Sequence, residues 1–272
     1  MDPKAARTPL VLRPIEEVGR SVLRFLEELG RVSRIGFSGT VNIFLPPFRP
    51  GLIANQIEFI GIQSLPIILL ASTFTGAVFT YESYEAFHLF GAQGYVGGTV
   101  GVALTRELAP TLTGLLVAGR AGSAMAAEIG SMRVSEQIDA LHAMAVDPVN
   151  YLVKPRIIAA TLVLPMLTAI FDFTGILGSY GVAVYVLRMS PPEFTVRLQD
   201  WVDWDDVWAG LFKAIVFGYV IGVVASYKGF YTEGGAAGVG RATTSSVVVS
   251  SVAILVLNFF IAYFVTSSVG GE

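Results

Sequence analysis

The sequence predicts an all-α integral membrane protein, and three observations carry this prediction. Hydrophobic residues make up 53% of the 272 residues, and charged residues make up only 14%. Five apolar runs are long enough to cross a bilayer as helices of about 20 residues. The hydrophobic signal is continuous rather than alternating from residue to residue, which argues against a β-barrel.

Residues 1–50 form an N-terminal segment ahead of the membrane domain, which we place at residues 51–272. Apolar residues recur in this segment at three- and four-residue steps, with charged residues between them: Ile15, Val18, Val22, Phe25, Leu26, Leu29 and Val32. This spacing predicts an amphipathic helix lying in the inner membrane interface. The alternative is a helix packed on a cytoplasmic partner. Pro46, Pro47 and Pro50 break the chain before the first span.

The five apolar runs predict five transmembrane helices, at residues 59–81, 97–119, 157–187, 207–227 and 242–271. Four charges interrupt them, namely Arg106, Glu107, Asp172 and Lys213. Counted along the helices, all four fall in one layer about 8–12 Å beneath the outer face. A charge at membrane depth costs about 2.5 kcal/mol or more, so we expect pairs such as Glu107–Lys213 or Arg106–Asp172. Such pairs either hold the helices together or line a cavity for a polar head group.

A polar stretch between the second and third runs, residues 119–149, keeps apolar residues at helical spacing, which predicts an amphipathic docking helix within it. We expect Ile138 and Leu141 to be its apolar anchors on a soluble partner, because buried apolar anchors carry most interface energy. Charged residues would make polar contacts around them: Glu128, Arg133, Glu136 and Asp139.

The distribution of Lys and Arg predicts the orientation. With the N-terminus in the cytoplasm, the inside receives nearly all of them and the outside receives only Arg188 and Arg197. The docking helix is then cytoplasmic and the C-terminus lies outside. The three tryptophans, Trp201, Trp204 and Trp208, fall in the outer loop before the fourth span. Their spacing predicts one face of a short interfacial helix, or alternatively an aromatic belt that anchors that span.

Catalytic signals are weak in this sequence. It contains no cysteine and no Gly-Lys dipeptide, so it has neither a thiolate metal site nor a phosphate-binding P-loop. His88 and His142 are predicted on opposite sides of the membrane and cannot share a metal within one subunit. We therefore expect no enzyme activity, no metal, no cofactor and no nucleic-acid partner.

A long central motif resembles the signature of the MlaE (YrbE-type) ABC permease family: Leu104-TRELAPTLTGLLVAGRAGSAMAAEIGSMRVSEQIDALHAMAVDP-Val149. Two further segments are similar to that family, Ser64-Leu65-Pro66 with Phe74-Thr75-Gly76 in the first span, and Gly240-RATTSSVVVSS-Val252 opening the last. The resemblance runs over about residues 58–264. It implies a multi-pass permease of the bacterial inner (plasma) membrane.

The resemblance also implies partners and a substrate. The permease would be a homodimer bound to a separate ABC ATPase, with an MCE-domain protein on the outer side and a phospholipid or related lipid as substrate. The docking helix would then be the coupling helix, over about residues 131–144. Arg106, Glu107 and Lys213 would lie near the lipid cavity, and Leu69, Phe74 and Val78 of the first span would form its apolar wall. Two glycine pairs, Gly97/Gly101 and Gly218/Gly222, offer close helix packing either between or within subunits.

Two other functions remain open from the sequence. A secondary transporter would need coupled ion sites and usually an inverted internal repeat, and no convincing repeat is visible. A membrane scaffold that recruits a cytoplasmic partner would need no aligned layer of intramembrane charge. Copurification with an ATPase separates both alternatives from the permease.

Overall fold

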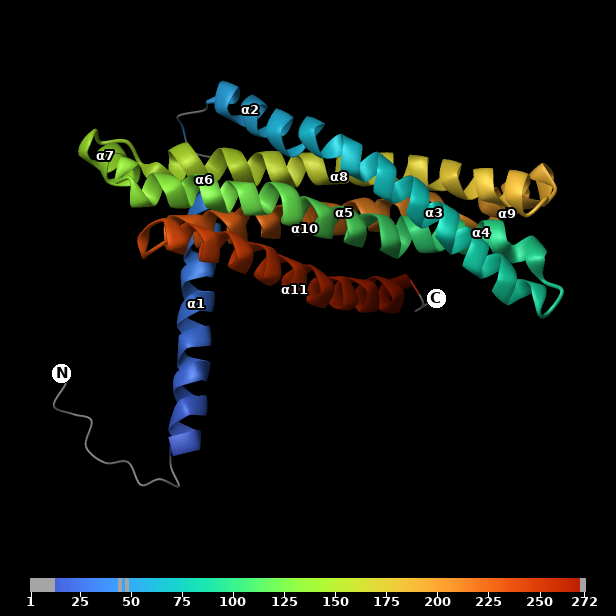
Figure 1. The fold of residues 1–272 in the computed structure, drawn as a ribbon, viewed down its shortest axis with the longest axis horizontal. Helices are drawn as coiled ribbons and strands as arrows, with labels where there is room; N and C mark the ends of the chain where they lie inside the picture. Colours follow the sequence, from blue (N-terminus) through green and yellow to red (C-terminus); the bar gives the residue numbers. More distant parts are fainter. Residues whose placement is uncertain (1–12, 44–45, 47–48, 270–272) are drawn as a thin grey trace.

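The computed structural model describes residues 13–43, 46 and 49–269, and the regular elements in this part of the chain are helices. Most of them lie side by side in an elongated bundle (Figure 1). In chain order the elements are α1 (Arg13–Ile43), α2 (Pro50–Ile60), η1 (Ile62–Ser64), α3 (Leu65–His88), η2 (Gln93–Tyr95), α4 (Val96–Ala103), η3 (Leu104–Leu108), α5 (Ala109–Val117), η4 (Ala118–Gly122), α6 (Ser123–Val134), α7 (Gln137–Ala143), η5 (Val149–Val153), α8 (Lys154–Gly181), η6 (Val182–Val186), α9 (Pro191–Trp201), α10 (Trp204–Phe230) and α11 (Gly235–Val269).

Among the described residues, five helical segments are long and apolar enough to cross a membrane, which confirms the predicted number of spans. They are Pro50–His88, Gln93–Val134, Val149–Val186, Trp204–Phe230 and Gly235–Phe264. The second span is longer than its apolar run, because the helix continues through much of the polar stretch to Val134. Four π-helical turns, η3 to η6, lie within or at the ends of the second and third spans.

The two ends of the bundle carry different connections. The short helix α7 lies at one end, and α9 lies at the opposite end together with the connection between α3 and α4 (Figure 1). We refer to these as the α7 end and the α9 end. The charged cluster described below joins the second, fourth and fifth spans.

Helix α8 packs against α3 on one side and α10 on another, and the core is built around these contacts. Phe171, Phe217 and Leu164 are fully buried there. The contact between α3 and α8 is close enough to need glycine, because a Cβ at Gly76 would lie 2.0 Å from the Gly175 carbonyl oxygen. Burial of these apolar side chains and close backbone contact hold the helices together.

The glycine pairs noted in the sequence pack within the chain. A Cβ at Gly97 would lie 2.3 Å from the carbonyl oxygen of Phe194 in α9, and one at Gly218 would lie 2.4 Å from that of Ala160 in α8. Their pair members Gly101 and Gly222 also face the same two helices, α9 and α8. The intrasubunit alternative therefore holds for both pairs, and neither supports a dimer contact.

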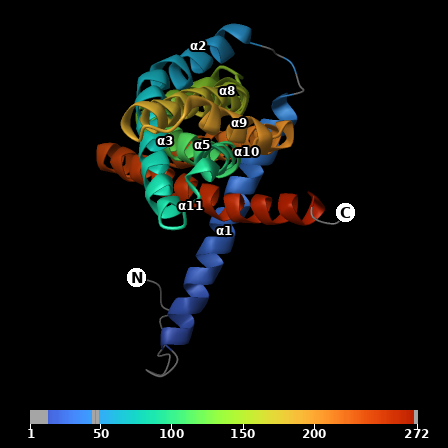
Figure 2. The ribbon, with the colours of Figure 1, turned by 90° about the vertical axis from the view of Figure 1, so that its right-hand side faces the viewer.

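Helix α1 runs nearly across the direction of the bundle and projects away from it (Figures 1 and 2). It is attached near its C-terminal end, where Ile35 packs against Val223 and Tyr227 of α10. Leu23, Leu26 and Phe37 remain exposed on it. Residues 1–12 of the predicted N-terminal segment lie outside the described residues, as do several apolar side chains of the predicted stripe: Ile15, Val18, Val22, Phe25 and Leu29.

The three tryptophans do not share one helix, so that prediction is wrong. Trp201 ends α9, Val202 and Asp203 are extended, and Trp204 begins α10. Asp203 caps α10 together with Asp206, which accepts a hydrogen bond from the backbone N–H of Asp203. The helix therefore restarts at a favourable N-cap sequence, which the tryptophan spacing alone did not reveal.

Candidate functional site

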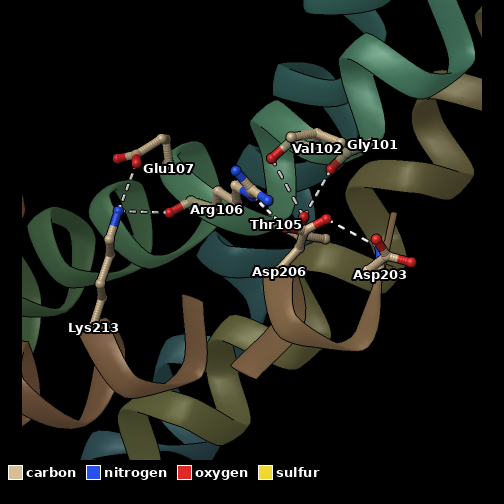
Figure 3. A network of polar contacts seen from close by, with 8 residues as sticks. All are labelled: Gly101, Val102, Thr105, Arg106, Glu107, Asp203, Asp206 and Lys213. Atoms are coloured by element: carbon tan, nitrogen blue, oxygen red, sulfur yellow. Dashed lines mark hydrogen bonds and ion pairs between the residues drawn. The ribbon is translucent and has the colours of Figure 1, made fainter. Parts of the chain in front are cut away.

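A cluster of charged side chains links the second and fourth spans (Figure 3). It lies toward the α9 end, because α9 ends at Trp201 and α10 begins at Trp204. The π-helical turn η3 carries Arg106 and Glu107, and α10 carries Lys213. The Lys213 ammonium donates to Glu107 Oε1 at 2.6 Å and to the Arg106 carbonyl oxygen at 2.9 Å. The predicted Glu107–Lys213 pair is present. Lys213 is 2% exposed, so its charge is satisfied inside the protein.

The fifth span contributes to the same cluster. Asn258 of α11 donates from Nδ2 to Glu107 Oε2 at 2.9 Å, so the two carboxylate oxygens bind two different helices. Sequence reasoning did not select Asn258. Its signal was visible, because it is the sole side-chain amide in the uncharged run 242–271. A polar side chain within such a run is expected to find a partner on a neighbouring helix.

Arg106 pairs with Asp206 and not with Asp172, so the second predicted pair is wrong. Asp206 lies at the start of α10 and is 1% exposed, while the Arg106 side chain is 51% exposed. The interaction uses Arg106 Nε and Asp206 Oδ1. The sequence prediction missed Asp206 because the boundary of the fourth span was placed after it. The capping turn of α10 brings this carboxylate to the charged layer (Figure 3).

Asp172 lies apart from these contacts. It is buried in α8, and its Oδ1 atom has no hydrogen-bond partner among the described residues. A buried polar atom without a partner destabilises a fold. Asp172 thus makes none of the ion pairs described above and is not a member of the charged cluster.

The predicted apolar wall lies on the first span. Leu69, Phe74 and Val78 are all exposed side chains of α3. Four buried residues of the same helix pack toward the core at four-residue spacing, namely Ile68, Ser72, Gly76 and Thr80. The three predicted wall residues thus remain available for contact with lipid or another chain. They are on a different span from the charged cluster.

The predicted docking helix is divided in two. Helix α6 ends at Val134, Glu136 has a left-handed backbone with φ of 60°, and α7 begins at Gln137. Ile138 is fully buried with Ile129 and Leu152, and Leu141 packs partly against this cluster. The apolar spacing thus indicates packing inside the chain, so Ile138 cannot serve as a docking anchor in this conformation. Met144, which the prediction did not select as an anchor, is an apolar side chain that is 65% exposed.

The charged residues near α7 form pairs within the chain. Arg133 NH1 donates to Asp139 Oδ1 at 2.7 Å, and Arg156 NH2 lies 2.7 Å from Glu128 Oε2. Glu136 is exposed at the turn. Asp139 and Glu136 therefore remain on the surface of the α7 end, while Glu128 ties α6 to α8.

Bundled apolar spans joined by buried polar pairs define a multi-pass α-helical membrane protein. Comparison with known proteins specifies the class further. The pattern of the family described as Permease MlaE matches residues 53–264. A probable ABC transporter permease protein of Rickettsia felis is 42% identical over 252 residues, which cover 93% of this chain and 97% of that protein.

Two more distant relatives have more specific names. The intermembrane phospholipid transport system permease protein MlaE of Haemophilus influenzae is 34% identical over 255 residues, covering 93% of this chain and 97% of that protein. The chloroplastic protein TRIGALACTOSYLDIACYLGLYCEROL 1 of Arabidopsis thaliana is 39% identical over 223 residues, covering 79% and 62%. The chain belongs to the MlaE family of ABC transporter permeases.

Proposed function

We propose that this permease moves phospholipid or a related lipid between the inner membrane and an MCE-domain carrier on the outer side. A separate ATPase would supply the energy, and two copies of the chain would form the transport pathway. The Haemophilus influenzae relative, which this chain matches over nearly its whole length, is named as a phospholipid transport permease. That name supports the substrate class. The absence of a P-loop from the sequence supports a separate ATPase.

The observation that carries the substrate proposal is the exposure of Arg106. Its side chain is 51% exposed among apolar spans, and the ion pair with Asp206 uses Nε. A guanidinium group presents a fork of donors that matches phosphate oxygens. Arg106 is therefore the residue that we assign to the phosphate of a lipid head group. Lys213, which is buried and bonded to Glu107, is assigned a structural role.

The exposed side chains of α3 suit the other part of a lipid. Leu69, Phe74 and Val78 would contact acyl chains, which gain about 0.8 kcal/mol for each CH₂ group removed from water. The charge distribution supports an orientation with the α7 end in the cytoplasm and the C-terminus outside. In that orientation α1, which crosses the bundle direction, would lie in the plane of the inner interface (Figures 1 and 2).

The experiment is lipid transfer by the complex of the full chain with its copurified ATPase, in liposomes of defined phospholipid. Arg106→Ala should lower transfer by about tenfold or more, since a charged hydrogen bond to phosphate contributes about 1.5–3 kcal/mol. Arg197→Ala is the control, because Arg197 is another half-exposed arginine, at the α9 end on α9. Transfer at the wild-type rate by a folded, ATPase-bound Arg106→Ala complex would refute the head-group assignment. Failure of any ATPase to copurify would favour a secondary transporter or a scaffold.

A further inference from the structure

Arg120 makes a set of contacts between the second span and a junction in the first span. From the π-helical turn η4, its NH1 donates to the Phe59 carbonyl oxygen at 2.7 Å and to Ser64 Oγ at 2.9 Å. Its NH2 donates to Gln63 Oε1 at 2.5 Å. The guanidinium carbon also lies 5.1 Å from the centre of the Phe59 ring. One side chain thus contacts the end of α2 and the 3₁₀ turn η1 that leads into α3.

The junction is a place where the helix hydrogen bonds are interrupted. Helix α2 ends at Ile60, Gly61 follows as its C-cap, and α3 restarts after the single 3₁₀ turn η1 with Pro66 in its first turn. The last carbonyl groups of a helix lack partners within it, and proline supplies no N–H. Here Arg120 binds the Phe59 carbonyl and Ser64 Oγ donates to the Ile60 carbonyl at 2.6 Å. A cation at a helix C-terminus is also favoured by the helix dipole.

The turn that carries Arg120 is itself irregular and joins further helices. In a π-helical turn the backbone bonds slip by one residue, and such turns mark places where helices bend. Ser123 Oγ, at the start of α6, donates to the Gly119 carbonyl oxygen of this turn at 2.5 Å. A Cβ at Gly122 would lie 3.3 Å from Ile221 of α10, so the turn also packs closely on the fourth span.

A continuous helix connects this turn to the α7 end. Helix α6 begins at Ser123, immediately after η4, and runs for 12 residues to Val134. At 1.5 Å per residue it is a lever of about 18 Å. Its end is tied to α7 by the Arg133–Asp139 pair. Helix α6 and this ion pair thus connect α7 to η4, and Arg120 connects η4 to the α2–α3 junction.

We propose that Arg120 is a positioning residue that couples movement at the α7 end to the angle between α2 and α3. This inference rests on the proposed function, in which a separate ATPase binds the α7 end and α3 carries the lipid-facing side chains. When the ATPase moves α7, the three hydrogen bonds of Arg120 carry α2 and the start of α3 with η4. Without them the first span moves independently of the second.

The test uses spin labels on the chain, which has no cysteine of its own. Ala54→Cys on α2 and Glu85→Cys on α3 introduce two exposed sites, and pulsed electron paramagnetic resonance measures the distance between their labels. The complex with its ATPase is measured without nucleotide and after trapping with ATP and orthovanadate. We expect trapping to shift the distance in the parent chain. In Arg120→Lys, which keeps the charge but has one donor nitrogen, the shift should be lost.

Lipid moved per ATP hydrolysed is the second readout. Arg120→Lys should lower it by about two- to thirtyfold, the range for residues that carry coupling between sites. Gln63→Ala, which removes one exposed acceptor of Arg120, should lower it less. Arg197→Lys is the matched control, because Arg197 also stacks on an aromatic ring, with its guanidinium carbon 5.2 Å from the centre of Tyr95. It should retain both the shift and the parent transport ratio.

The outcomes separate this inference from the proposed function. No shift in the parent chain, or an unchanged shift in Arg120→Lys, overturns the coupling role. The coupling role is also overturned if Arg120→Lys loses the distance shift but moves as much lipid per ATP as the parent chain. Arg120 would then have a structural role only. If the parent and Arg197→Lys complexes shift but move no lipid, while Arg120→Lys does not shift, the coupling role stands and the lipid proposal fails.

Discussion

Lys213 and Glu107 form an ion pair whose two partners differ greatly in exposure. Lys213 is 2% exposed and its Nζ lies 2.6 Å from Glu107 Oε1, whereas the Glu107 side chain is 43% exposed. Glu107 has a second donor in Asn258, while the remaining acceptor of Lys213 is the Arg106 carbonyl oxygen. A buried ammonium without a carboxylate is costly, so stability depends more on Glu107 than on Lys213.

This asymmetry predicts the effect of breaking the pair from each side. Glu107→Gln should destabilise the protein by about 3 kcal/mol, the lower end of the range for a broken buried ion pair, because the buried Lys213 side chain loses its carboxylate partner. Lys213→Met should cost about 1 kcal/mol, comparable to one lost hydrogen bond, because Glu107 retains Asn258. Half-unfolding temperatures in detergent, followed by tryptophan fluorescence, measure both. A larger loss for Lys213→Met than for Glu107→Gln would contradict this reasoning.

The contact between α3 and α8 predicts that Gly76 does not tolerate a side chain. Gly76→Ala should destabilise by about 2 kcal/mol, within the range for overpacking, because its Cβ would lie 2.0 Å from the Gly175 carbonyl oxygen. Gly240→Ala in α11 is the control, since nothing lies within 4 Å of a Cβ there. It should be neutral or stabilise by about 0.5–1 kcal/mol through its effect on helix propensity. Equal unfolding temperatures for the two variants would contradict this prediction. They would show that α3 and α8 can move apart to admit a methyl group without loss of stability.

Asp172 predicts a stabilising substitution. Its carboxyl group is buried in α8, and Oδ1 lacks a hydrogen-bond partner among the described residues. Asp172→Leu removes a buried polar atom whose missing hydrogen bond costs about 1–3 kcal/mol, so the unfolding temperature should rise. Thr168→Val, one turn earlier in α8, provides a comparison with a second buried oxygen that has no partner in the described part of the chain. A fall in stability for Asp172→Leu would contradict this prediction.

The number of spans and one ion pair could be predicted from the sequence. The length of each apolar run and the presence of a charge within it are properties of one segment of the chain. Residues 59–81 and 242–271 contain no charge, and their length alone predicts that they span the membrane. Glu107–Lys213 was predictable because each needed a partner of opposite charge at the same depth. The Arg106–Asp206 pair was not predictable, because it depends on a capping turn that places Asp206 at the start of α10.

Burial also separated two interpretations that helical spacing could not. Ile138 and Leu141 recur with the spacing of an apolar helix face, which is the same for an intrachain core and for a docking surface. The structure buries Ile138 with Ile129 and Leu152, which lie on α6 and η5. Arg120 was missed for a related reason. Its partners are a backbone carbonyl and two uncharged side chains of another span, and pairing by charge does not find them.

The final prediction concerns the contact with the ATPase, for which the exposed surface at α7 is the expected site. Met144 follows α7 and is 65% exposed, in contrast to the fully buried Ile138. We expect Met144→Asp to weaken copurification of the ATPase by about tenfold or more, since buried apolar anchors at an interface contribute about 2 kcal/mol each. Its unfolding temperature should stay unchanged, because the side chain is exposed.

Ile138→Asp serves as the opposite case for that prediction. It places a charge in the cluster formed with Ile129 and Leu152, so it should lower the unfolding temperature, with loss of ATPase binding following from unfolding. Leu89→Asp is the control for Met144→Asp, because Leu89 is an 80% exposed apolar residue near the α9 end. It should leave ATPase binding intact, since that end faces away from the cytoplasm in the proposed orientation. If Leu89→Asp lowers ATPase binding and Met144→Asp does not, both the orientation and the docking surface are wrong.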